Sequence, residues 1–124
     1  MNEDLQNKLK NRFPVLLEKI AYFECSDGWY FLIDSLSESI QITINSMPEQ
    51  IRSDFYAVQI KEKFGTLRYY MNHTTPYIDG AISMAEHMSA WHCEDCGSPG
   101  SSRSIKGYIQ TLCDKHYEDK NGKR

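Results

Sequence analysis

Apolar residues recur at helical spacing from the N-terminus to Ile20. The recurrence is interrupted by Pro14, because proline lacks a backbone N–H donor and clashes with the preceding helical turn. We therefore expect one helix that ends near Phe13 and a second short helix that opens at Pro14. The apolar positions behind these two helices are Leu5, Leu9, Phe13, Leu16, Leu17 and Ile20.

A clearer amphipathic pattern follows over residues 28–44. One face of this predicted helix is apolar, and the other carries polar residues such as Asp34 and Glu38. Ser26 or Asp27 can cap its N-terminus. We expect this helix to be the central packing element of the fold. Its apolar face consists of Trp29, Leu32, Ile33, Leu36 and Ile40.

The period changes to strict alternation in the middle of the chain. Apolar and polar residues alternate on both sides of Gly65, which predicts a β-hairpin with strands at about 55–62 and 66–72. Two strands alone are only marginally stable in water. A helix must therefore cover one face of the hairpin, and the helix that contains Trp29 is the natural candidate.

Helical spacing returns over residues 76–91, where Thr75 can act as the N-cap. The apolar stripe of this helix consists of Ile78, Ile82, Ala85 and Met88. Together the elements predict an α+β fold, with helices packed on a small antiparallel sheet at about 55–72. We expect a body at 1–91 and a segment at 92–124 that docks on it through helix 76–91, or one single domain that includes both.

The composition is that of a globular chain, because 40% of the 124 residues are hydrophobic and 25% are charged. A formal net charge of −3 does not create the positive field that holds phosphates without sequence preference. The N-terminus lacks an apolar leader, and no apolar run approaches the ~18 residues that span a bilayer. We therefore expect a cytoplasmic protein with no membrane partner, whose clustered cysteines stay reduced and available to a metal.

Two pairs of metal-ligand residues lie in the C-terminal segment. They are Cys93-x-x-Cys96 and Cys113-x-x-His116, separated by sixteen residues. Zinc takes four sulfur or imidazole donors in a tetrahedron, which this spacing can supply. Gly97 allows the chain to turn back after the first pair, and the second pair falls on the first turn of a predicted helix. A knuckle, a short hairpin and a helix, in that order, predict a treble-clef-like zinc finger.

Other interpretations of the cluster stay open. The pattern could be a surface C-x-x-C with an unrelated histidine, or a redox pair, although a redox C-x-x-C should precede a long helix in a βαβ unit. His92 adjoins the cluster and could replace His116 as a ligand, but His116 has the better spacing. Cys25 lies outside the cluster, and we expect a small buried hydrophobe or a functional thiol.

The predicted metal ion is structural and not catalytic. A catalytic zinc ion usually keeps three protein ligands and one open position, whereas four ligands here would close its shell. The motif H-E-x-x-H is absent, and the deaminase pattern fails because neither His87 nor His92 is followed by the required glutamate. An enzyme that uses carboxylates hidden by the sequence is a third hypothesis, so the question of enzymatic activity stays open.

The predicted hairpin combines cations with aromatic residues. Such a combination can stack bases and hold phosphates, but an ordinary hairpin with outward polar residues would have the same composition. The candidate residues for binding a partner or a nucleic acid are Lys61, Lys63, Phe64, Arg68, Tyr69 and Tyr70.

Four motifs occur in a distinctive order. They are DGWY at 27–30, VQIKEKFGTLRYY at 58–70, CEDCGSPG at 93–100 and TLCDKH at 111–116. Their conjunction resembles a family of small uncharacterised proteins of tailed bacteriophages and prophages. The resemblance implies a phage origin, and therefore the cytoplasm of a host cell, together with a C-terminal zinc finger. It implies no activity.

The chain departs from the pattern of that family at Thr66 and Tyr108, where a glycine and a tryptophan are frequent. These departures leave the expected ligands unchanged. The leading hypothesis is a non-enzymatic, zinc-stabilised binding module that modulates or inhibits a host protein, because tyrosine and tryptophan are favoured anchors at protein contacts. The alternative is a nucleic-acid-binding accessory protein that uses the Lys61–Tyr70 hairpin and the zinc finger.

Overall fold

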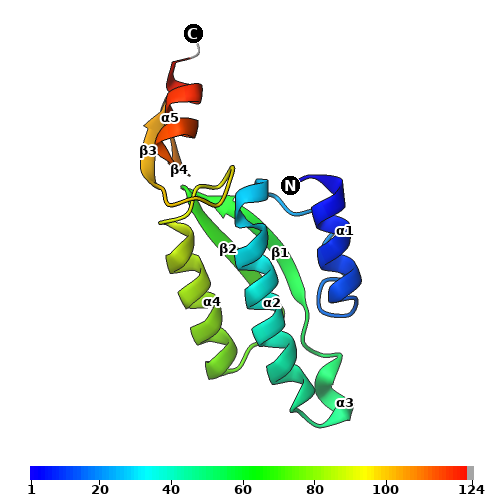
Figure 1. The fold of residues 1–124 in the computed structure, drawn as a ribbon. Coiled ribbons are helices and arrows are strands. Elements are labelled where there is room, and N and C mark those ends of the chain that lie inside the picture. Colours follow the sequence, from blue (N-terminus) through cyan, green and yellow to red (C-terminus); the bar gives the residue numbers. More distant parts are fainter. Residues whose placement is uncertain (123–124) are drawn as a thin grey trace.

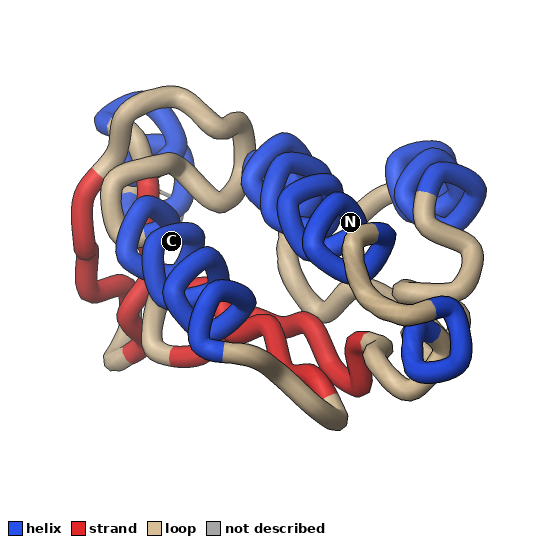
Figure 2. Tube along the Cα trace, turned by 90° about the horizontal axis from the view of Figure 1, so that it is seen from below, coloured by secondary structure: helices blue, strands red, loops and turns tan. Residues whose placement is uncertain are grey.

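The computed structural model describes residues 1–122, so the last two residues of the predicted zinc-finger segment lie outside the described residues. A two-stranded antiparallel sheet, β1 (Ala57–Lys63) and β2 (Thr66–Met71), forms one layer of the body. Helices cover one face of this sheet, and a smaller C-terminal unit stands at one end of the body (Figures 1 and 2). The predicted α+β class is confirmed.

The N-terminal helix α1 (Glu3–Arg12) is capped by Asn2, whose side chain accepts a hydrogen bond from the Leu5 N–H at 2.9 Å. The helix ends next to Phe13, as predicted, but the second short helix at Pro14 does not form. Residues 14–19 form turns instead, and the Leu16 carbonyl accepts a hydrogen bond from the N–H of Ala57 at 2.9 Å. The apolar spacing there reflects burial in the core and not helical structure.

The central helix α2 (Tyr30–Asn45) follows a short 3₁₀ helix, η1 (Asp27–Trp29). The predicted range of 28–44 agrees with this pair of elements. Trp29 and Ile33 are fully buried, as the apolar stripe requires. Ser37, on the same helix, is also buried, and its hydroxyl is hydrogen-bonded to that of Tyr69 at 2.9 Å. After one further turn, α3 (Glu49–Arg52), the chain enters the sheet.

The last helix of the body is α4 (Pro76–Ser89), which begins at the predicted residue and packs against α2 and β2. Thr75 caps it by accepting a hydrogen bond from the Ile78 N–H at 3.2 Å. Met88 does not belong to its buried stripe, because 37% of Met88 is exposed. The buried position is Ser89, whose hydroxyl accepts a hydrogen bond from the Leu67 N–H at 2.8 Å.

The C-terminal unit consists of a second hairpin and a helix: β3 (Ser101–Ile105), β4 (Tyr108–Leu112) and α5 (Asp114–Asn121). The two hairpins form separate sheets. No helix within residues 1–122 is long and apolar enough to cross a membrane.

Candidate metal centre

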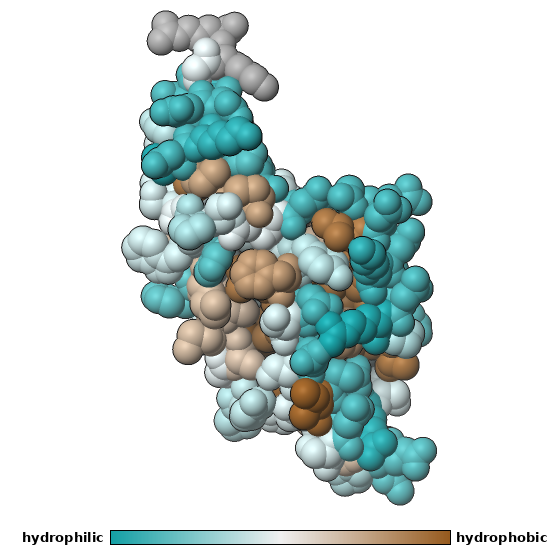
Figure 3. Space-filling model, in the orientation of Figure 1, coloured by the Kyte–Doolittle hydropathy of each residue, from teal (hydrophilic) through white to brown (hydrophobic). Residues whose placement is uncertain are grey.

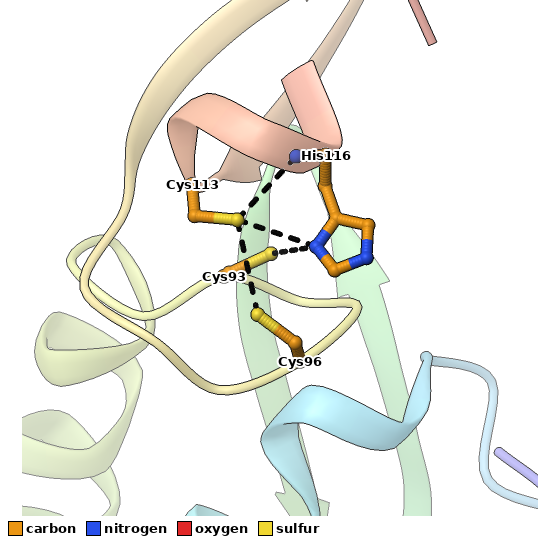
Figure 4. Close-up of side chains that lie close together, drawn as sticks. All are labelled: Cys93, Cys96, Cys113 and His116. Atoms are coloured by element: carbon orange, nitrogen blue, oxygen red, sulfur yellow. Dashed lines mark hydrogen bonds between the residues drawn. The ribbon is translucent and has the colours of Figure 1, made fainter. Parts of the chain in front are cut away.

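The four predicted ligands come together from two segments of the C-terminal unit. Cys93 and Cys96 lie on the loop that follows α4, and Cys113 and His116 lie at the start of α5. Their side chains point toward one another in Figure 4. The donor atoms all lie within 4.8 Å of one another, so one ion could contact all four. Among residues 1–122, no other group of three or more such side chains is this close.

The measured separations define the shape of the cluster. The Nδ1 atom of His116 lies 3.6 Å from the sulfur of Cys93 and 3.2 Å from the sulfur of Cys113. The sulfurs of Cys96 and Cys113 are 3.8 Å apart. It is therefore Nδ1, and not Nε2, that faces the sulfurs (Figure 4).

Local backbone geometry explains why the two side chains of each ligand pair point toward the same place. Gly97 has a φ of +81°, a conformation that other residues rarely adopt, and its N–H donates to the carbonyl of Cys93 at 2.8 Å. The chain thus folds back on itself after Cys96. Cys113 is the N-cap of α5, and its sulfur accepts a hydrogen bond from the His116 N–H at 3.4 Å. Both pairs are therefore arranged by tight turns.

The environments of the two loop thiols differ. Burial raises the pKa of the Cys93 thiol, whereas hydrogen bonding from Ser98 lowers the pKa of the exposed Cys96 to about 6. The thiolate is the form that binds metals, so Cys96 is partly prepared for coordination. At Cys93, the attraction of a bound cation would have to offset the effect of burial.

The alternative ligand His92 does not reach the cluster. Its Nδ1 donates to the carbonyl of Met88 at 2.9 Å, and its ring lies edge-on to Phe31 at a centroid distance of 5.5 Å. Cys25 is not part of the cluster and is buried among core residues. Burial raises the pKa of the Cys25 thiol to about 12, which leaves it protonated and unreactive at neutral pH.

The C-terminal unit contacts the body mainly through η1. The carbonyl of Glu94 accepts a hydrogen bond from the Gly28 N–H at 2.6 Å, and the Glu94 carboxylate accepts one from the Ser26 N–H at 2.9 Å. The indole N–H of Trp29 donates to the carbonyl of His92 at 2.9 Å. The predicted helix 76–91, through which we expected docking, supplies the covalent connection and the Trp91 carbonyl, which accepts a hydrogen bond from the Gly100 N–H at 2.9 Å. The other polar contacts come from η1 and its N-cap, Ser26.

Gly28 is a residue of this contact that sequence reasoning missed. A Cβ atom at this position would lie 2.2 Å from the Cys93 carbonyl oxygen and 2.5 Å from the backbone nitrogen of Gly97. No other residue type fits such a close approach of two backbones. The motif DGWY contains this glycine, but periodicity gave no sign of its role, because the approach joins segments that are far apart in the sequence.

The candidate residues of the hairpin differ in their exposure to solvent. Phe64 is 72% exposed, and Lys63, Tyr70 and much of Lys61 are also accessible. Arg68 is half-buried, and its guanidinium lies 3.8 Å from the Glu86 carboxylate. Lys61 faces Arg68 across the two strands.

Tyr69 differs from the rest of that set. It is 2% exposed, and its hydroxyl is bonded to Ser37 in the core. Burial raises its pKa well above that of a free tyrosine. The predicted binding role of Tyr69 is therefore wrong, because the alternation of β2 directs this side chain toward the helices and Tyr70 toward solvent.

We predict that Gly28→Ala destabilises the fold by about 2 kcal/mol or more, because a Cβ would force the loop of Cys93 away from η1. Gly80→Ala is the matched control. Nothing lies within 4 Å of a Cβ at this helical position, so the change is expected to be neutral or stabilising by up to about 1 kcal/mol. Urea unfolding of both variants measures the difference, and equal stability of Gly28→Ala and the unaltered chain would contradict the role of this contact.

No protein-family model, curated protein or solved structure matches this chain. The role of the molecule must therefore be argued from its own residues. The cluster of Cys93, Cys96, Cys113 and His116 is a plausible metal site by its donor types and spacing.

Proposed function

We propose that this protein is a non-enzymatic binding module that docks a helix of a partner protein, while a structural zinc ion orders its C-terminal unit. The observation that carries the proposal is an apolar groove between α2 and α4. Its volume is about 610 Å³. The residues that line it are Phe31, Leu32, Ser35, Leu36, Ser39, Pro76, Tyr77, Gly80, Ala81, Met84, Ala85 and Met88.

The choice of zinc follows from the donor types and distances. At metal–ligand distances of about 2.3 Å for sulfur and 2.0–2.1 Å for nitrogen, a tetrahedron has edges of about 3.8 Å between sulfurs and about 3.6 Å between sulfur and nitrogen. The Cys96–Cys113 and Cys93–His116 separations match these edges at 3.8 Å and 3.6 Å, while the Cys113–His116 separation of 3.2 Å is shorter than the ideal edge. Four protein ligands suit a structural ion in a treble-clef-like arrangement of knuckle, hairpin and helix.

The groove combines large apolar walls with small residues. Phe31 and Met84 are 44% and 62% exposed, which is unusual for side chains of this type that lie close together. Gly80 and Ser35 add no bulk, so another backbone could approach closely. Figure 3 shows apolar surface over α4 and the adjoining edge of α2, with polar surface on either side. The lining contains no carboxylate, imidazole or thiol, which suits binding better than catalysis.

The spacing of the apolar groove residues on α4 indicates a helix as the occupant. The exposed side chains of Tyr77, Met84 and Met88 and the partly buried Ala81 stand at 77, 81, 84 and 88, at intervals of four, three and four residues. This is the a/d spacing of a coiled-coil seam, at which the side chains of one helix insert between those of another. Helix α4 therefore carries exposed apolar side chains next to its buried stripe.

The residues that line the groove include no charged side chain. The carboxylates of Asp34 and Glu38 on α2 lie outside the lining and contact Arg12 of α1. Apolar contact is therefore the main source of affinity, and methionine suits it because its flexible side chain adapts to the partner. The resemblance to phage proteins adds the expectation that the partner is a host protein in the cytoplasm, which this chain inhibits or redirects.

For the metal, we predict about one zinc ion per chain by elemental analysis. Cys96→Ser or Cys113→Ser should abolish zinc retention and lower the free energy of unfolding, because the binding energy of a structural ion is also folding energy. Cys25→Ala, which removes a thiol that is not part of the cluster, should retain the ion. Full zinc content in either ligand variant would contradict the assigned ligand set.

For the groove, we predict that the unaltered chain captures a stoichiometric protein partner from host lysate and that Met84→Glu reduces the yield at least about tenfold. Tyr22→Glu is the matched control, since Tyr22 and Met84 are both 62% exposed and Tyr22 lies outside the groove. Quantitative mass spectrometry of cross-linked complexes, which maps the bound segment, measures the effect. Capture that survives Met84→Glu, or a bound segment that is not helical, would refute the proposal.

A further inference from the structure

The two hairpins of this protein end in turns of the same unusual kind. Phe64 and Gly65 have φ values of +52° and +82°, and Lys106 and Gly107 have +50° and +85°. Positive φ at both central residues defines the tight turns that suit the twist of antiparallel strands. The first position of such turns favours asparagine, aspartate or glycine, so a phenylalanine there is exceptional.

Phe64 gains no burial that would offset this conformation. It is 72% exposed, and Tyr108, next to the other turn, is 75% exposed. These are the two most exposed large hydrophobic side chains in the described part of the chain. An outlying conformation that packing does not explain is a reason to look for a binding role.

The two aromatic residues line one cavity of about 400 Å³ between the tips of the hairpins. Its remaining lining residues are Glu62, Gly107, Ile109 and Gln110. Phe64 thus belongs to the body and Tyr108 to the C-terminal unit, and the cavity lies between two aromatic rings contributed by different hairpins.

Hydrogen bonds hold the two walls of this cavity in place. The hydroxyl of Thr111 is buried and donates to the carbonyl of Gly65 at 2.6 Å, which joins the second hairpin to the tip of the first. The carboxylate of Glu62 accepts a hydrogen bond from the Gly65 N–H at 2.8 Å. The two backbone segments that carry the rings are therefore held next to each other before any ligand binds, which reduces the entropy lost on binding.

A lysine lies beside the Phe64 ring, and the turn of the second hairpin contains another. The ammonium group of Lys63 lies 5.8 Å from the centre of the Phe64 ring, and Lys106 precedes the glycine of the second turn. Neither lysine forms an ion pair with any residue in the range 1–122. Unpaired cations beside aromatic faces are the combination that binds single-stranded nucleic acid, since rings stack on bases and ammonium groups contact phosphates.

We propose that the cavity between Phe64 and Tyr108 binds an unpaired base of single-stranded nucleic acid, with Lys63 and Lys106 positioned for the adjacent phosphates. Glu62 and Gln110 contribute polar groups to the same wall, which can contact the edge of a base. A duplex keeps its bases stacked on one another and cannot insert one between the two rings. This site lies outside the α2–α4 groove and does not depend on its occupant.

The test uses the chain of 124 residues, produced with zinc supplied, and fluorescently labelled single-stranded DNA and RNA of about 12 nucleotides. We expect anisotropy to report binding at low salt that weakens as salt rises, and duplexes of the same length to bind at least about tenfold more weakly. Phe64→Gly and Tyr108→Ala should each weaken binding about tenfold or more. Tyr22→Ala removes an aromatic ring of similar exposure outside the cavity and should leave affinity unchanged.

The melting temperature of the Phe64→Gly variant distinguishes a binding role of Phe64 from a structural one. Because glycine adopts positive φ readily, Phe64→Gly should leave the melting temperature unchanged or raise it while binding is lost. The proposal is overturned if neither single-stranded probe binds at low salt, if both aromatic variants bind like the unaltered chain, or if duplexes bind as tightly as single strands. Retained binding by Met84→Glu would show that this site works independently of the groove.

Discussion

The contact of the Cys93–Gly97 loop with the backbone at Gly28 is the constraint on which the arrangement of the molecule depends. The C-terminal unit buries few apolar side chains of its own, chiefly Cys93 and Leu112, so it cannot be ordered by a hydrophobic core. Its loop instead lies directly against η1, where a glycine allows two backbones to meet. Because Trp29 of η1 is fully buried, the position of the candidate metal site is tied to the core of the body.

The same contact fixes the position of the two hairpins relative to each other. The loop sets where β3 and β4 begin, and the bond from Thr111 to Gly65 then joins the second hairpin to the tip of the first. Two elements that are each too small to be stable alone thus support one another. The cavity between Phe64 and Tyr108 exists only as a consequence of this pairing, because each ring comes from a different hairpin.

Much of the fold could be predicted from periodicity. Features that depend on contacts between distant segments could not. The helix containing Ile33 and the hairpin around Gly65 were predicted within about two residues, because each buries one regular face. On α4 periodicity placed Ile78 and Ala85 correctly in the core but also assigned Met88 to it, which is exposed. One sequence cannot show where a buried stripe ends and an adjoining exposed apolar stripe begins. Periodicity also missed Gly28, whose role depends on a distant segment.

The apolar groove and the cavity between the hairpins therefore depend on different parts of the molecule. The walls of the groove belong to α2 and α4, which pack on each other and on the sheet through residues such as Ile33 and Ile78. The C-terminal unit adds no residue to that lining. The cavity between the hairpins, in contrast, takes Tyr108 from this unit. An ion bound by Cys113 and His116 would thus order the wall of the cavity that Tyr108 supplies, whereas the groove depends on the core of the body. Loss of the ion would therefore change the cavity more than the groove.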